Sequence, residues 1–278
     1  MLRIARHALR RQLSTMPVAA LVPPGQCQFG EDWTSAPLVG RAELNHDTRL
    51  FTFGLPDAAK PLGLSTCACL LARGGGTGDE PLVRPYTPVS TNALVGAFEL
   101  MVKVYPSGLS AHLDALPLGG AVGFKHIPFN VKTQYPFGVK RLSMLAGGTG
   151  ITPMLQALHA LLGSAGDGTV VDLIYGSKTE RDILARDTLD AWAAAHPGRL
   201  RVTHVLSHEA DGAGWAGERG LVTRELIAAH CAPPSESTAV FVCGPPPMYD
   251  ALCGPRGESE IAGALAELGY ASDQVFKF

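Results

Sequence analysis

The sequence predicts a β + α/β fold, in which an antiparallel β-barrel domain is followed by a doubly wound parallel-sheet domain. Residues 37–138 hold short apolar runs with partial alternation, separated by Gly, Pro, Asn and Asp. Such runs are typical of antiparallel strands, and their number and spacing favour a barrel. After residue 139, apolar β-branched runs alternate with segments of helical periodicity, which indicates a parallel sheet covered by helices.

Composition agrees with two globular domains and excludes several classes of protein. The chain has 278 residues, of which 46% are hydrophobic and 17% charged. A net charge of −2 argues against a nucleic-acid binder. The six cysteines lack the spacing of zinc sites or iron–sulfur clusters, so we expect reduced thiols and no metal. No apolar run approaches the roughly 20 residues of a transmembrane helix.

Residues 1–30 form a separate segment with four arginines and no acidic residue. At helical spacing its leucines fall on one face and its arginines on another. An amphipathic, Arg-rich and acid-free segment is typical of a mitochondrial targeting peptide. We expect a mitochondrial protein from which the segment up to about Met16 is removed; the alternative is a tail without an address and a cytoplasmic protein.

In the first domain we expect one helix, at residues 108–116, with Ser107 or Ser110 capping its start. Strands are expected at residues 38–56, 66–73, 81–90, 98–105 and 121–129. In the second domain we expect strands at 141–146, 169–176, 200–207 and 238–244, alternating with helices at 152–163, 181–196, 223–230 and 246–253.

The stretch "RPYTPVS", residues 84–90, combines an arginine and a tyrosine with prolines. In an extended strand Arg84, Tyr86 and Pro88 share one side, while Pro85 and Thr87 share the other. Prolines cost ladder hydrogen bonds, so this strand lies at a sheet edge or beside a ligand. A plain polar edge strand remains the alternative.

Two loops follow strands of the second domain. In "LAGGTGITPMLQ" the glycines allow close backbone approach, Thr152 suits the N-cap and Pro153 the first helical position, so the helix N-terminus favours a pyrophosphate. The loop departs from G-x-G-x-x-G because Pro153 replaces the third glycine. In "VFVCGPPPMY", Cys243 ends a strand and precedes Gly244 and three prolines. Cys243 is either a buried small residue or part of the wall of a dinucleotide groove.

The three motifs "RPYTPVS", "GGTGITPM" and "CGPPPM", in this order, resemble those of NADH–cytochrome b5 reductases in the ferredoxin-reductase-like superfamily. The likeness extends over residues 37–278. It implies an FAD-binding barrel at 31–138 and an NAD(P)H-binding domain at 139–278. Two segments, "STCACLLAR" and "FKHIPFNVKTQYPF", depart from the family's usual pattern.

The resemblance implies which residues hold the cofactors. Arg84 would pair with the FAD pyrophosphate, Tyr86 would pack on the flavin, and the Thr87 hydroxyl would lie beside the reactive flavin N5. The remaining FAD residues would be Pro85, Lys103, Tyr105, Gly108, Leu109, Ser110 and Thr152. The NADH residues would be Gly147, Gly148, Thr149, Gly150, Pro153, Cys243, Gly244, Pro245, Pro246 and Met248, with Thr87 and Cys243 assigned to catalysis.

The implied reaction passes a hydride from NADH to FAD and then single electrons to a separate acceptor, cytochrome b5 or a similar small haem protein. Docking candidates are Lys125, Lys132, Lys140 and Arg141, which are equally consistent with a solvated surface. Two other functions remain open: the reductase component of an oxygenase or nitrate-reducing system, and a flavin-binding interaction module without activity. We expect a monomer.

The choice of nucleotide depends on the strand that ends at Ser207. An acid at this edge favours the free 2′-hydroxyl of NADH, and Glu209 is such an acid. Ser207 could donate to a 2′-phosphate, and Arg219 could fold back toward it, but Arg219 has to cross a glycine-rich loop. We therefore predict that NADH exceeds NADPH at least roughly tenfold in kcat/KM, or ~1.4 kcal/mol, with Ser207 and Glu209 lining the site.

Overall fold

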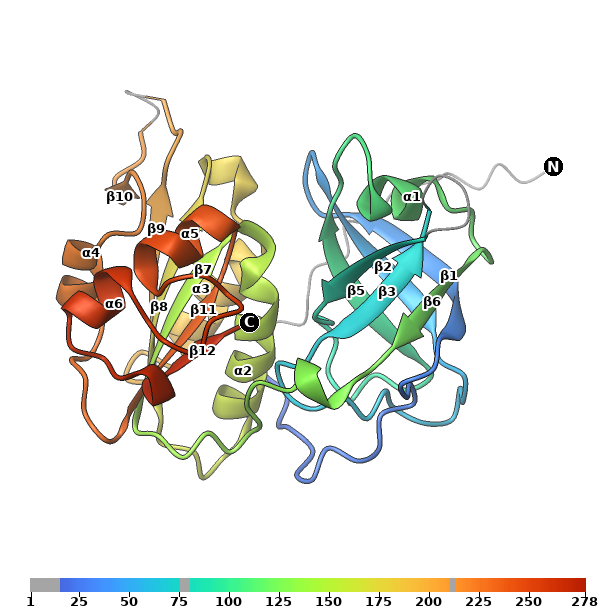
Figure 1. The fold of residues 1–278 in the computed structure, drawn as a ribbon, viewed down its shortest axis with the longest axis horizontal. Coiled ribbons are helices and arrows are strands. Elements are labelled where there is room, and N and C mark those ends of the chain that lie inside the picture. Colours follow the sequence, from blue (N-terminus) through green and yellow to red (C-terminus); the bar gives the residue numbers. More distant parts are fainter. Residues whose placement is uncertain (1–15, 76–80, 211–213) are drawn as a thin grey trace.

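The computed structural model describes residues 16–75, 81–210 and 214–278. The amphipathic segment expected at the N-terminus, residues 1–15, lies outside the described residues. Figure 1 shows a curled antiparallel sheet beside a parallel sheet covered by helices, so the predicted class of fold is confirmed. No helix in the described part of the chain has the length and apolar character needed to cross a membrane.

The first domain is a six-stranded sheet in the order β4-β3-β6-β1-β2-β5. Its strands are β1 Thr34–Glu43, β2 Thr48–Gly54, β3 Leu70–Gly74, β4 Leu82–Tyr86, β5 Ala97–Lys103 and β6 Ala121–Lys125. The chain after β4 returns to the far edge, where Val89 N–H donates to the Glu99 carbonyl of β5 at 2.8 Å. The sheet therefore curls into a partly closed barrel.

A cluster of phenylalanines fills the barrel. The rings of Phe29, Phe53, Phe98 and Phe124 are buried, with ring centroids 4.9–5.7 Å apart in edge-on, tilted and stacked pairs. Aromatic pairs at such distances add to the free energy gained from burying their area. The cluster fixes the curvature of the sheet and thereby the position of its edge strand β4.

The second domain is a six-stranded parallel sheet in the order β10-β9-β8-β7-β11-β12. Its strands are β7 Arg141–Gly147, β8 Val170–Ser177, β9 Leu200–Leu206, β10 Glu218–Arg219, β11 Thr238–Cys243 and β12 Val275–Lys277. Helices α2 Ile151–Gly163 and α3 Arg186–Ala195 pack on one face. Helices α4 Arg224–His230, α5 Pro246–Leu252 and α6 Gly263–Glu267 pack on the other.

The starts of helices α1 and α3 differ from the prediction. Helix α1, Leu109–Ala115, begins after Gly108, whose φ of 87° suits glycine, and no side chain caps it. Ser110 instead accepts a hydrogen bond from Tyr105 N–H, so the expected serine cap is wrong. Helix α3 begins at Arg186 rather than near Arg181, because Ala185 is left-handed (φ 56°) and interrupts the helical path.

Candidate functional site

The strand order of the parallel sheet reverses beside β7. From β7 the chain proceeds outward through β8, β9 and β10, and β11 and β12 then add on the other side. Ligands of open α/β sheets bind outside the carboxyl ends of the strands at such a reversal. The loops that follow β7 and β11 are the two glycine- and proline-rich motifs, residues 147–153 and 243–248.

These two loops are in backbone contact. A Cβ atom added at Gly150 would lie 2.0 Å from the Cys243 carbonyl oxygen, and one added at Gly147 would lie 2.8 Å from Met248 Sδ. At Gly148, which has a φ of +55°, an added Cβ would meet nothing within 4 Å. The loops therefore close on each other at Gly147 and Gly150 and leave free space at Gly148, as a cradle for a diphosphate or ribose requires.

Helix α2 starts earlier than predicted. A 3₁₀ turn, Gly148–Gly150, leads directly into Ile151, so Gly150 rather than Thr152 is the N-cap. Thr152 is 8% exposed, and Pro153 is the third helical residue. In the first turn of a helix a backbone N–H has no partner within the helix. Proline, which lacks an N–H, is therefore tolerated at this position.

A tyrosine that the sequence reading missed fixes the glycine loop. The Tyr175 hydroxyl, at the end of β8, donates to the Gly148 carbonyl at 2.9 Å and accepts from Leu184 N–H at 3.3 Å. Burial raises the pKa of Tyr175, which keeps the phenol protonated and able to donate. The sequence does contain a signal for this role. Tyr175 combines an aromatic ring with a polar hydroxyl and lies near the carboxyl end of the strand beside β7.

The edge strand β4 presents the residues assigned to FAD. Arg84 and Pro85 are exposed, whereas Tyr86 and Thr87 are half-buried. The Arg84 guanidinium donates to the Val83 carbonyl at 2.7 Å, and no ion pair joins it to a carboxylate among the described residues. Burial raises the pKa of Tyr86 to about 12, with an opposing effect from Arg84. An exposed arginine beside a neutral phenol suits a diphosphate and a planar ring.

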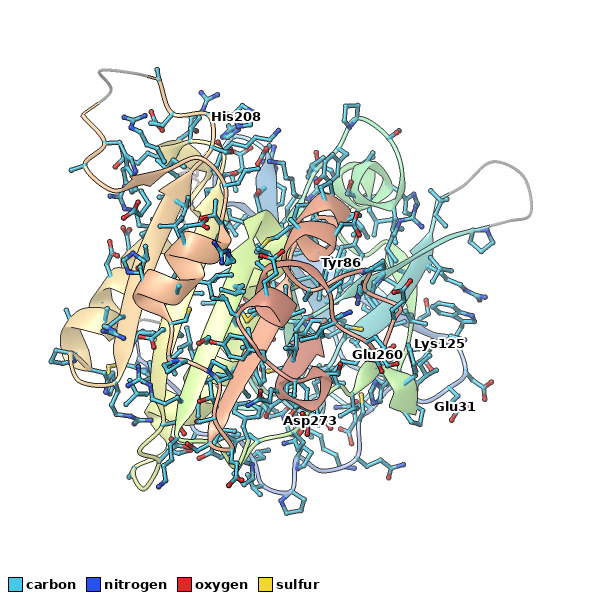
Figure 2. All side chains as sticks on the ribbon, turned by 60° about the vertical axis from the view of Figure 1, so that its left-hand side comes forward. Glu31, Tyr86, Lys125, His208, Glu260 and Asp273 are labelled. Atoms are coloured by element: carbon cyan, nitrogen blue, oxygen red, sulfur yellow. The ribbon has the colours of Figure 1, made fainter. Side chains whose placement is uncertain are left out.

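Helix α2 brings β4 and the glycine loop together. The Gln156 amide donates to the Pro88 and Ser90 carbonyls, each at 2.7 Å, in the second half of the "RPYTPVS" stretch. Cys67 Sγ donates to the Pro153 carbonyl at 3.2 Å. In Figure 2, Tyr86 lies where the two domains meet, and His208 lies at the carboxyl end of β9. The three motifs thus lie together where the two domains meet.

The other residues assigned to FAD have mixed surroundings. Tyr105 is 57% exposed, but the Leu109 side chain belongs to the barrel core and Ser110 is 7% exposed. Near Gly108, Leu109 and Ser110 a ligand would therefore meet mainly backbone groups. Lys103 is in an ion pair with Asp47 at 2.5 Å. Burial opposes ionisation of Asp47, but hydrogen bonds from Lys103 and Thr48 outweigh it and lower the pKa of Asp47.

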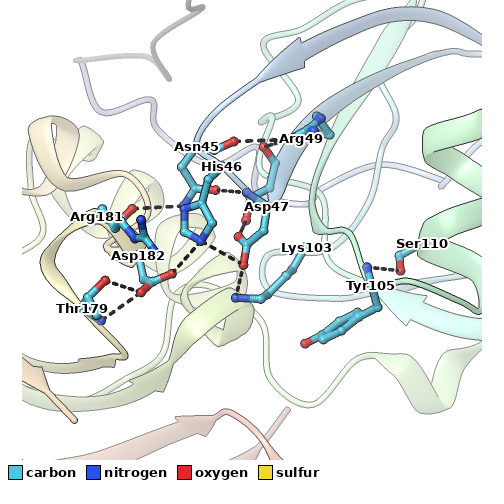
Figure 3. A network of polar contacts seen from close by, with 11 residues as sticks. Asn45, His46, Asp47, Arg49, Lys103, Tyr105, Ser110, Thr179, Arg181 and Asp182 are labelled. Atoms are coloured by element: carbon cyan, nitrogen blue, oxygen red, sulfur yellow. Dashed lines mark hydrogen bonds and ion pairs between the residues drawn. The ribbon is translucent and has the colours of Figure 1, made fainter. Parts of the chain in front are cut away.

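The Lys103–Asp47 pair belongs to a network that spans both domains (Figure 3). His46 Nε2 lies 3.5 Å from Asp47 Oδ2 and 3.4 Å from Asp182 Oδ1 of the second domain. Asn45 donates to the Arg181 carbonyl at 3.3 Å. Together with the hydrogen bonds of Gln156 and Cys67, this network joins the two domains.

Cys243 is a half-buried residue at the end of β11, packed against the core. Burial raises its pKa to about 11. The thiol is therefore protonated near pH 7 and is a poor nucleophile. Its place beside Gly150 and Gly244 suits contact with the nicotinamide ring better than covalent chemistry.

At the end of β9, Arg219 reaches Glu209, so the expectation that the glycine-rich loop keeps this arginine away is wrong. Strand β10 pairs with β9, and Arg219 donates to the Glu209 carbonyl at 3.0 Å, so the arginine does cross the loop. The Glu209 carboxylate accepts from Glu180 N–H at 2.6 Å. Ser207 Oγ lies 2.7 Å from His208 Nδ1. This edge carries both an acid and a cation.

The docking candidates separate into two pairs. Arg141 forms a 2.9 Å ion pair with buried Asp172, and Lys140 precedes it at the start of β7, at the opposite edge of the sheet from the glycine loop. Lys125 lies 4.9 Å above the Trp33 ring, and Lys132 lies 3.6 Å above the Phe129 ring, which is 76% exposed. Of the four candidates, Lys125 and Lys132 lie over aromatic rings, half-buried Trp33 and exposed Phe129.

Both domains match known protein families. Residues 35–127 match the oxidoreductase FAD-binding domain and residues 144–254 the oxidoreductase NAD-binding domain. The chain is similar to NADH-cytochrome b5 reductase 2 of Saccharomyces cerevisiae strain YJM789, with 40% identity over 90% of this chain and 84% of that protein. The Yarrowia lipolytica protein of the same name is 37% identical over 99% of this chain and 96% of its own length.

A solved structure supports the same grouping. The cytochrome b5 reductase domain of Ulva prolifera nitrate reductase superposes with a TM-score of 0.79 at 30% identity, covering 91% of this chain and all of that domain.

Gly150→Ala tests the contact between the two loops. The new Cβ would displace the Cys243 carbonyl, so we expect flavin reduction by the nucleotide to slow at least about tenfold, in the range of losses that a 1 Å displacement causes. Gly166→Ala is the control, because its added Cβ meets nothing within 4 Å. Equal rates for the two variants in stopped-flow measurements would contradict the proposed packing.

Cys243→Ser tests whether the thiol aligns the nicotinamide. We expect flavin reduction to slow while FAD stays bound, because the hydroxyl is smaller and more polar than the thiol it replaces. Stopped-flow reduction at the parent rate would assign Cys243 to packing alone.

Proposed function

Because the chain belongs to the NADH–cytochrome b5 reductase family, we propose that it passes electrons from NADH through FAD to a small haem protein of the cytochrome b5 type. The observation that supports this most is that β4 and the loops after β7 and β11 lie together where the two domains meet. We propose that the cofactors bind in a cleft between these segments. A donor and an acceptor bound to these motifs would face each other.

FAD, when bound, supplies the hydride acceptor and the route from two-electron to one-electron transfer. The chain would supply placement: Arg84 would bind the diphosphate, Tyr86 would pack on the ring, and the Thr87 hydroxyl would lie near its reacting edge. The Gly147–Gly150 backbone admits the nucleotide, and Cys243 and Met248 form the wall behind the nicotinamide. Hydride transfer needs no general acid or base, so a protonated Cys243 is no obstacle.

The acceptor would bind the surface around Lys125 and Lys132. Two cations, Lys125 and Arg73, flank Trp33 at 4.9 and 4.8 Å from its ring, and Lys132 covers the exposed Phe129. Such a surface attracts an acidic partner and supports a small, short-lived interface. One copy of the chain holds both halves of the cleft, so we propose that it acts as a monomer.

The reaction is tested by anaerobic titration of the FAD-loaded protein. We expect NADH to bleach the flavin absorbance and a cytochrome b5 to restore it. A protein that takes up FAD but keeps its absorbance with NADH would be a flavin-binding module without activity. Bleaching without reoxidation by cytochrome b5 would leave the reductase but overturn this acceptor.

A second acceptor has specific support. The similar solved domain belongs to a nitrate reductase. If the chain served such a system, its flavin would be reoxidised by that enzyme's haem domain much faster than by free cytochrome b5, and the same titration separates the two.

Arg84→Ala should weaken FAD binding. The diphosphate would lose a charge-assisted, two-point partner worth about 1.5–3 kcal/mol, or roughly 10- to 100-fold in Kd. Fluorescence titration of the apoprotein measures the change, and Arg73→Ala is the control because Arg73 stacks on Trp33 instead. Parent-like affinity in Arg84→Ala would refute the placement of this strand.

Arg219→Ala tests the choice of nucleotide. We propose that NADH remains preferred, and that Arg219 moderates the preference by offering a cation to a 2′-phosphate. The variant should then raise the NADH/NADPH ratio of kcat/KM about tenfold, or ~1.4 kcal/mol, while leaving NADH itself within about twofold. An unchanged ratio would mean that Arg219 only holds the loop at Glu209.

We also propose that residues 1–30 direct the protein to mitochondria, on the basis of their composition. A fluorescent reporter carrying this segment should accumulate in mitochondria, and replacing its four arginines by glutamine should abolish import. A reporter that stays in the cytosol would favour the cytoplasmic alternative.

A further inference from the structure

Residues 18–28 run in an extended path from the second domain to the first. This segment holds no helix or strand, yet its backbone touches both domains. In Figure 1 it is the blue ribbon at the lower edge, leading from the region between the two sheets into the barrel. We call residues 18–28 the strap.

The strap begins on the buried side of α2. Val18 N–H donates to His159 Nδ1 at 3.1 Å, although the two residues are 141 positions apart. His159 is 6% exposed and packs edge-on against Trp192, with ring centroids 4.7 Å apart. Burial lowers the pKa of His159 to about 4, so the ring is neutral near pH 7 and Nδ1 can accept this bond. His159 therefore provides the strap with a permanent acceptor.

The end of α2 is shaped for the strap. An added Cβ at Gly163 would lie 2.4 Å from Ala19 N and 2.5 Å from Val18 C. Both are backbone atoms, so the clash could be relieved only by moving the strap. Helix α2 ends at Gly163, and the strap backbone lies directly against this residue. A side chain at this position would leave no room for the strap.

The other end of the strap is anchored in the barrel domain. Gln28 N–H donates to the Leu62 carbonyl at 3.0 Å, and its side chain bonds Asp57 N–H at 2.8 Å and the Pro61 carbonyl at 2.9 Å. Gly63, with a φ of +70°, leaves room for the Gln26 carbonyl, which would lie 2.4 Å from an added Cβ. The next residue, Phe29, belongs to the phenylalanine core.

Between these anchors, the strap passes the contact of the two domains. Leu21 borders a small cavity lined from both sides, by Leu62 and Pro88 of the barrel domain and by Gln156 and His159 of α2. Gln156 is also the residue that holds α2 to the Pro88 and Ser90 carbonyls. The strap thus closes the side of the domain contact that lies along the C-terminal half of α2.

We infer that the strap positions α2, and with it the glycine loop at the start of that helix, against the flavin strand β4. His159 and Gly163 are positioning residues that act through the strap, without touching the nucleotide or the flavin. Hydride transfer requires the two reacting atoms to approach within about 3–3.5 Å. If the position of α2 were not fixed, hydride transfer would be slower even with both ligands bound. Removal of an N-terminal targeting segment would consequently have to stop before Val18.

Two truncations test this inference, which rests on the proposed NADH-to-flavin reaction. A chain that starts at Pro17 keeps the strap, and a chain that starts at Gln26 lacks its first anchor. Each is loaded with FAD, and stopped-flow reduction over a range of NADH concentrations gives the limiting rate and the apparent Kd. We expect the chain from Pro17 to match the full chain within about twofold and the chain from Gln26 to fall at least tenfold in limiting rate.

Point variants keep the test usable if the shorter chain does not fold. His159→Phe removes the acceptor and should lower the limiting rate, whereas His159→Gln restores an acceptor and should recover most of it. Melting temperature and FAD content are measured for each. A lower melting temperature with an unchanged limiting rate, for His159→Phe or the chain from Gln26, would overturn the positioning role. If the full chain itself is not reduced by NADH, the proposed function fails instead.

Discussion

The site depends on the backbone contact between Gly150 and the Cys243 carbonyl. Neighbouring strands β7 and β11 run parallel with Ala146 opposite Cys243, so their loops emerge side by side at the carboxyl edge of the sheet. A side chain at Gly150 would force these loops apart, because its Cβ would lie 2.0 Å from that oxygen. The two loops can lie against each other because a glycine stands at this position, and Tyr175 then holds the loop from the neighbouring strand.

The second requirement is a constant relation between the two domains. Helix α2 carries the glycine loop at its start and contacts the barrel domain through Pro153 and Gln156. Farther along the helix, His159 contacts the strap at Val18. On another side, His46 and Asn45 reach Asp182 and Arg181. Since the residues proposed to hold FAD and NADH come from both domains, these contacts would set the distance between the two bound cofactors.

The order of elements could be predicted from the sequence because it follows from periodicity. Alternating apolar runs predicted the antiparallel sheet, and the change to helical spacing predicted the parallel one. The starts of helices were less predictable, because they depend on single backbone angles. Gly150 displaced Thr152 as the cap of α2 since a 3₁₀ turn precedes the helix, and left-handed Ala185 delayed α3.

The motifs around Arg84, Gly147 and Cys243 were visible in the sequence because each is a continuous stretch. Contacts between distant residues were not visible. Tyr175 reaches Gly148 only through the pairing of β8 with β7, and Arg219 reaches Glu209 only because β10 adds to β9. Val18 and His159 are 141 residues apart, and neither residue carries a local signal of the other.

The central claim is that FAD and nicotinamide meet in the cleft between β4 and the loops after β7 and β11. A crystal structure of the protein with FAD and NAD⁺ tests it most directly. The account predicts the Arg84 guanidinium within hydrogen-bond distance of the FAD diphosphate, and the nicotinamide between the flavin ring and Cys243. A diphosphate held by another segment, with Arg84 still donating to the Val83 carbonyl, would contradict it.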